Sequence, residues 1–82
     1  MFKKIKWLYE RRQYRKAMQN VISLVRYTLP NISLHKGADL VCAVLDFIEE
    51  YRKQFGENDG FATFYAMELD HLYLKEKMKY DN

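Results

Sequence analysis

Apolar and aromatic residues recur in the first third of the chain at steps of three, four and seven, the spacing of one face of an α-helix. The residues that set this pattern are Trp7, Tyr14, Met18, Val21, Val25 and Leu29. No Gly or Pro interrupts them, and Pro30 disfavours helical geometry in the residue before it. The pattern predicts one helix over residues 2–29, followed by a connector, NISLHKG, that Ile32 and Leu34 anchor.

A second apolar stripe predicts an amphipathic helix over residues 38–55. Its members, spaced by three and four, are Val41, Val44, Ile48, Tyr51 and Phe55. Asp39 suits the positive first turn of this helix, and Gly56 suits its C-terminus. On the polar side, Glu49 and Lys53 have the i,i+4 order that favours a surface ion pair.

The third predicted helix, residues 59–79 with Asn58 or Asp59 as its N-cap, carries two apolar stripes where a surface helix needs one. The first stripe is Phe61, Tyr65, Leu69 and Leu72. The second is Phe64, Met67, His71, Leu74 and Met78. Three helices can bury only one of these stripes. We therefore expect the second to remain exposed as an interface for self-association or for a partner.

Composition agrees with a single all-α domain over residues 1–82. The chain is 49% hydrophobic with only three Gly and one Pro, which argues against disorder and against a loop-rich fold. Cys42 is the sole cysteine, so an intrachain disulfide is excluded and a reducing cytoplasm is favoured. A chain this short buries only about 60% of its unfolded surface, so we expect a three-helix bundle that forms a homo-oligomer, most simply a dimer.

The charge is distributed unevenly. Residues 1–38 carry nine Lys and Arg against Glu10 alone, whereas residues 39–82 carry five against ten Asp and Glu. The candidate binding residues in the predicted first helix are Arg11, Arg12, Arg15, Lys16 and Arg26. All except Arg11 share one side of that helix, since 3.6 residues make one turn, and Arg11 lies on the apolar seam.

This basic side has two interpretations. A row of cations can contact nucleic-acid phosphates while neighbouring aromatic rings stack on bases. Alternatively, it attracts protein, either a partner or the acidic face of the second helix, in this copy or another. That acidic face consists of Asp46, Glu49 and Glu50. The opening MFKKIKWL mixes Trp and Lys as membrane-surface helices do, but its apolar side chains spread around the helix, so we do not expect membrane binding.

Candidate chemistry is sparse. Glu68 and His71 have the Glu-x-x-His spacing of di-iron bundles, but the inner stripe of the second helix offers no carboxylate to complete a site. Cys42 has no activating base at a recognisable spacing, and no glycine-rich phosphate loop occurs. We therefore expect no catalysis, no metal and no cofactor.

The function we expect is that of an interaction module: an inhibitor, adaptor or accessory regulator that occupies a partner protein. Phages and other mobile elements encode many short helical chains of this kind, and such an origin is part of the expectation. Nucleic-acid binding through the basic side of the first helix is the alternative.

Overall fold

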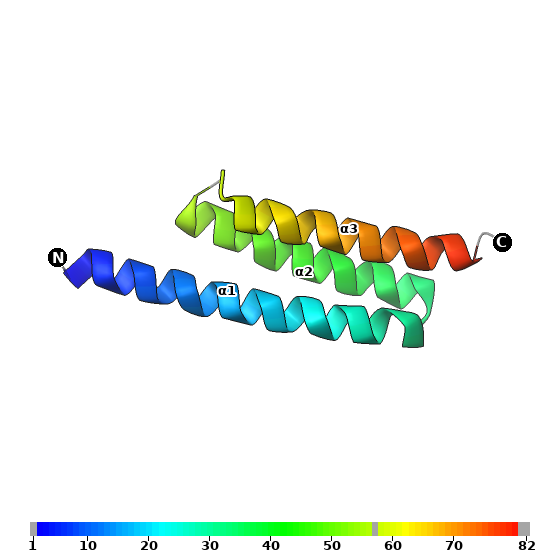
Figure 1. Cartoon of the computed structure of the whole chain (residues 1–82). Helices are drawn as coiled ribbons and strands as arrows, with labels where there is room; N and C mark the ends of the chain where they lie inside the picture. Colours follow the sequence, from blue (N-terminus) through cyan, green and yellow to red (C-terminus); the bar gives the residue numbers. More distant parts are fainter. Residues whose placement is uncertain (1, 57, 81–82) are drawn as a thin grey trace.

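The computed structural model describes residues 2–56 and 58–80, and over these residues the chain forms a bundle of three helices. The elements are α1 (Phe2–Thr28), the short 3-10 helix η1 (Leu29–Asn31), α2 (Leu34–Phe55) and α3 (Gly60–Tyr80). α1 and α3 run in one direction and α2 in the other, and the N-terminal end of α1 projects past the end of α2 (Figure 1). The bundle is elongated, 56 × 20 × 15 Å. The predicted all-α three-helix bundle is confirmed.

The core lies along the line where the three helices meet. Every member of the predicted α2 stripe is buried, which confirms that part of the pattern: Val41, Val44, Ile48, Tyr51 and Phe55. α3 contributes Ala62 and Leu69, both fully buried. The 3.6-residue spacing thus identified the inner face of α2. Of the predicted inner stripe of α3, only Leu69 is fully buried, whereas Phe61, Tyr65 and Leu72 are partly buried.

α1 buries a slightly different stripe from the predicted one. Ile22 is 1% exposed although the sequence pattern omitted it, and Val21 is only partly buried. Met18, Ile22 and Val25 share the inner face because steps of four and three bring residues to the same side of a helix. Trp7 remains 37% exposed and packs edge-on against Phe55, with ring centroids 5.7 Å apart, because it lies near the projecting end of α1.

α2 begins at Leu34, four residues before the expected start. Ser33 is its N-cap, since the Ser33 hydroxyl accepts a hydrogen bond from the Lys36 backbone N–H at 3.2 Å. Asp39 therefore lies beyond the first turn, and its predicted role there is wrong. Gly37 is buried within the helix, where a Cβ would lie 3.0 Å from Leu29 Cδ2, so its lack of a side chain permits close packing.

The connection from α2 to α3 uses the residues that the sequence predicted. Gly56 has a φ of 132°, a conformation that favours glycine, and its N–H donates to the Arg52 carbonyl at 2.9 Å. Asp59 caps α3, because its Oδ1 accepts from the Phe61 backbone N–H at 2.8 Å. This cap leaves the second carboxylate oxygen of Asp59 available for other partners.

The predicted ion pair between Glu49 and Lys53 is not the one that forms. Glu49 pairs with Arg52 at 3.1 Å, and Lys53 lies 3.9 Å from Glu50. Arg52 also donates to Thr63 Oγ1 of α3 at 3.2 Å. The forked guanidinium reaches a carboxylate on its own helix and a hydroxyl on the next one at the same time, which a lysine ammonium at position 53 is not placed to do.

Candidate functional site

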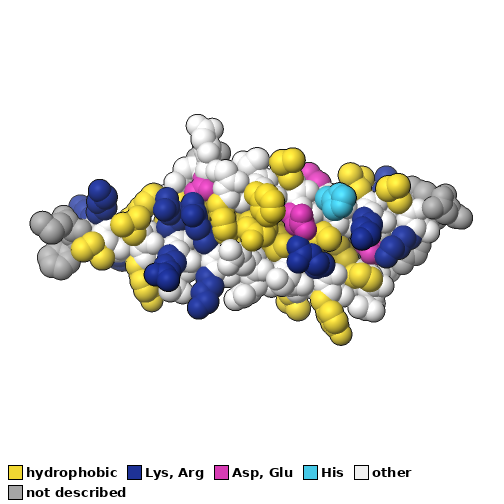
Figure 2. Space-filling view, in the orientation of Figure 1, with side chains coloured by type: hydrophobic (Ala, Val, Ile, Leu, Met, Phe, Trp, Pro, Cys, Tyr) yellow, Lys and Arg dark blue, Asp and Glu magenta, His cyan; other side chains and the backbone are white. Residues whose placement is uncertain are grey.

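The ten predicted site residues lie on two surfaces. The first, called the basic face, is the set of α1 cations Arg11, Arg12, Arg15, Lys16 and Arg26. The second, called the apolar face, is the α3 stripe Phe64, Met67, His71, Leu74 and Met78. Figure 2 shows dark-blue side chains gathered over the N-terminal half of α1 and hydrophobic ones spread over α3.

Arg15 is not free to bind a partner in the way that the sequence suggested. Its Nε donates to the Tyr51 hydroxyl at 2.7 Å, and its Nη2 donates to Asp59 Oδ2 at 3.0 Å. The Tyr51 hydroxyl in turn donates to the same carboxylate oxygen at 2.7 Å. The guanidinium also lies over the Phe61 ring, 4.8 Å from its centroid. Arg15 therefore joins α1, α2 and the start of α3.

The protonation states of this triad follow from its surroundings. Burial raises the pKa of Tyr51, and the hydrogen bond from Arg15 only partly opposes that effect. Burial also disfavours the charged form of Asp59, but hydrogen bonds from Tyr51, Arg15 and the Phe61 backbone outweigh it and lower its pKa. The hydrogen bond to Tyr51 raises the pKa of Arg15. At neutral pH the triad therefore holds a neutral phenol between a carboxylate and a guanidinium.

Arg26 is also paired within the chain. Its Nη2 lies 2.7 Å from Glu68 Oε1 of α3, in a pair whose side chains are 56% and 27% exposed. The sequence suggested that the basic face is attracted to the acidic face of α2. Instead, Arg15 pairs with Asp59 and Arg26 pairs with Glu68, because α3 and its N-cap lie beside α1. Sequence spacing offered no signal for either pair, because each depends on how α3 crosses α1.

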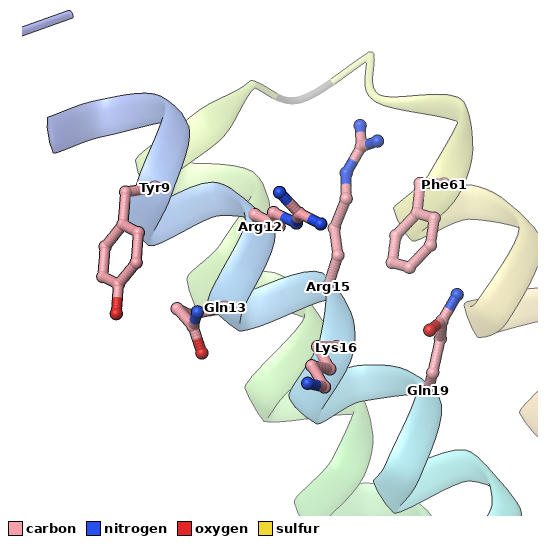
Figure 3. Close-up of a pocket in the computed structure, with 7 residues that line it drawn as sticks. All are labelled: Tyr9, Arg12, Gln13, Arg15, Lys16, Gln19 and Phe61. Carbon is pink, nitrogen blue, oxygen red and sulfur yellow. The ribbon is translucent and has the colours of Figure 1, made fainter. Parts of the chain in front are cut away.

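Arg12 and Lys16 are the cations of the basic face that remain exposed and unpaired within the described residues. They border an open pocket of about 570 Å³, which Figure 3 shows from the side of α1. The lining residues are Tyr9, Arg12, Gln13, Arg15, Lys16, Gln19 and Phe61. None of these is acidic, so the pocket is positive. Arg11 lies outside it, with its guanidinium 4.9 Å from the Trp7 ring centroid.

The apolar face is as open as the sequence predicted. Phe64, Met67, Leu74 and Met78 are 60%, 66%, 55% and 65% exposed, and His71 is exposed between them. On the opposite side of α3, the buried positions recur every seven residues: Ala62, Leu69 and Glu76. The apolar face therefore points away from the bundle.

Metal-ligating side chains are dispersed over the described residues, which include no cluster of three or more His, Cys, Asp or Glu side chains that could hold a metal ion. Cys42 is exposed and forms no disulfide within the described residues. Among residues 2–56 and 58–80, no helix has the length and apolar character to cross a bilayer.

Three comparisons with known proteins, against family models, curated sequences and solved structures, found no match.

Proposed function

We propose that this protein is a non-enzymatic interaction module that binds a partner protein through the apolar face of α3 and acts as an inhibitor, adaptor or accessory regulator. The observation that carries the proposal is the exposure of four large apolar side chains, each more than half open to solvent, along one face of one helix. A contiguous apolar stripe of this kind on a soluble domain is typical of an interface.

The composition and support of this face favour protein as its partner. Phe and Met are enriched at protein interfaces, and the flexible side chains of Met67 and Met78 can adapt to an irregular surface. The face is also held in place, because Ala62 and Leu69 anchor the reverse side of α3 in the core. Little backbone entropy would therefore be lost on binding.

Affinity capture with matched baits tests this function. Met67→Glu places a charge in the centre of the apolar face, whereas Ala43→Glu adds the same charge at an exposed position of α2. We expect the wild-type chain and the Ala43→Glu variant to enrich the same partner, and the Met67→Glu variant to lose it by at least about tenfold. Equal capture by all three baits would contradict the proposal.

A second candidate function, nucleic-acid binding, is favoured by one observation: Arg12 and Lys16 border a positive pocket with Tyr9 and Phe61 at its edges. Its test is fluorescence anisotropy with duplex and single-stranded oligonucleotides at about 50 and 200 mM salt. The Arg12→Gln, Lys16→Gln double variant should bind more weakly and with a shallower salt dependence. Lys53→Gln, which changes an exposed cation on α2, is the control.

A further inference from the structure

We propose that the apolar face is covered by the same face of a second copy of this chain, with the two α3 helices antiparallel. The inference rests on the proposed function in one respect, namely that this face is a protein interface. It names the partner and the orientation, and it follows from the order of charges along α3.

The spacing of the apolar face is that of a two-stranded coiled-coil seam. In a heptad written abcdefg, Phe64, His71 and Met78 occupy a positions, and Met67 and Leu74 occupy d positions. The f positions, opposite such a seam, are Ala62, Leu69 and Glu76. These are the α3 residues buried against the bundle. A second helix can therefore pack on the seam without displacing any residue of the core.

The charges beside the seam change sign halfway along the helix. Glu68 and Asp70 flank the N-terminal half, and Lys75 and Lys77 flank the C-terminal half. Glu68 and Lys75 lie along one edge, at e positions, while Asp70 and Lys77 lie along the other, at g positions. Each edge thus carries one negative and one positive side chain, separated by two turns.

An antiparallel pair matches these charges in full. With the two-fold axis between His71 and Leu74, each His71 meets the Leu74 of the second copy. Each charged e position then faces an e position of opposite sign, and each charged g position faces a g position of opposite sign. The resulting contacts are Glu68 with Lys75 and Asp70 with Lys77, each formed twice by symmetry. A parallel pair would match only Asp70 with Lys75 and would place the two His71 rings together.

The available partners of these charged residues fit this arrangement. Asp70, Lys75 and Lys77 are exposed and form no ion pair within the described residues. Glu68 uses Oε1 for Arg26 at 2.7 Å and has a second carboxylate oxygen for a lysine across the interface. We therefore regard the edge formed by Asp70 and Lys77 as the cleaner one to test.

The placement of α1 also favours the antiparallel pair. α1 and α3 run in the same direction, so the basic N-terminal half of α1 lies toward the same end of the bundle as the start of α3 (Figures 1 and 2). An antiparallel dimer places the two basic halves at opposite ends of the assembly. A parallel dimer would bring them together, where like charges repel.

Sedimentation equilibrium between about 1 and 300 μM tests whether the face pairs with itself. We expect a monomer–dimer equilibrium for the wild-type chain and for Ala43→Glu. Leu74→Glu should weaken the dimer by at least about tenfold, because two copies of the new carboxylate would enter the seam. Circular dichroism would verify that each variant is folded. A dimer that Leu74→Glu leaves unchanged would overturn the inference, because its interface would lie elsewhere.

Charge reversal tests the orientation. Asp70→Lys alone, or Lys77→Asp alone, should weaken the homodimer by about tenfold, since two attractive contacts become repulsive. Combining both substitutions in one chain should restore wild-type affinity, and an equimolar mixture of the two single variants should form a heterodimer. A parallel dimer would not be restored, because the lysine introduced at position 70 would face Lys75, and that result would overturn the antiparallel arrangement.

The inference and the proposed function can fail separately. A wild-type chain that remains monomeric up to about 300 μM overturns the dimer. The interaction function survives that result if Met67→Glu still abolishes capture of another protein. It fails as well if capture does not depend on the apolar face.

Discussion

Replacing Asp59 by asparagine should destabilise the fold even though asparagine is as good a helix cap as aspartate. Asp59 accepts from the Phe61 backbone with Oδ1 and from Arg15 and Tyr51 with Oδ2. An asparagine that kept its oxygen on Phe61 would turn its NH₂ group toward Arg15, where two donors would meet. The substitution therefore tests the triad while sparing the cap.

The size of the effect follows from the burial of the pair. Exposed ion pairs contribute about 0.2–1 kcal/mol, whereas breaking a fully buried pair costs about 3–5 kcal/mol. The side chains of Arg15 and Asp59 are 34% and 9% exposed, so this pair lies between those limits. We expect Asp59→Asn to lower the free energy of unfolding by about 1–3 kcal/mol, out of roughly 4–12 kcal/mol for a domain of this length.

The assay is urea unfolding followed by far-ultraviolet circular dichroism, at several pH values from 7 down to 3. The pKa of Asp59 is lowered in the folded chain, so its ionised form stabilises the fold above the unfolded pKa of about 3.9. That contribution is lost as the pH falls below this value and through the lowered folded pKa. The difference in unfolding free energy between wild type and Asp59→Asn should therefore be largest near pH 7 and shrink below about pH 4.

Tyr51→Phe separates the two side-chain donors to Asp59. It removes the phenol hydrogen bond, the largest of the contributions that lower the pKa of Asp59, and keeps the Arg15 guanidinium, which lies 3.0 Å from that carboxylate. The pH-dependent part of the stability should therefore be smaller than in the wild-type chain. A difference between wild type and Asp59→Asn below about 0.5 kcal/mol at pH 7, or one that does not change with pH, would refute the role assigned to the ionised Asp59.

Two further predictions concern packing and the backbone. Ile48→Ala should lower the free energy of unfolding by about 2–5 kcal/mol, because Ile48 is 1% exposed in the core. Urea unfolding measures this loss, and a smaller value would mean that the core collapses around the shorter side chain. Gly60→Ala should stabilise the chain by about 0.5 kcal/mol, since a Cβ there meets no atom within 4 Å. Gly56→Ala should instead destabilise the chain by about 1 kcal/mol, because the φ of 132° at this position is strained for a residue with a side chain. Equal melting temperatures for the two glycine variants would contradict this account.

Much of the fold could be predicted because each helix carries its own periodic signal. The α2 stripe, Gly56 as the C-cap and Asp59 as the N-cap are local features. A helix cap forms its hydrogen bonds with backbone groups only a few residues away, so sequence spacing is enough to predict it. The start of α2 at Leu34 differs from the predicted one, because the turn that follows the Ser33 cap holds His35, Lys36 and Gly37 and only one large apolar residue, Leu34. The exposure of the apolar face also followed from sequence, since three helices cannot bury two opposite stripes.

The partners of the basic residues could not be predicted in this way. Arg12, Arg15 and Lys16 have the same charge and lie within five positions of one another, and no spacing rule separates them. Only the crossing of α1 with α3 brings Asp59 to Arg15 and leaves Arg12 and Lys16 exposed at the pocket. Ion pairs between residues far apart in the chain depend on this relative placement of helices, which periodicity does not encode.

The sequence by itself thus determined three helices, the inner face of α2, the caps at the α2–α3 turn and the apolar face of α3, because backbone hydrogen bonding and burial impose their period on the chain. The tertiary structure decided which cations are committed to the fold. Arg15 and Arg26 are held by carboxylates 44 and 42 residues away, and electrostatic pairing at a few ångströms depends on distance in space and not on distance along the chain.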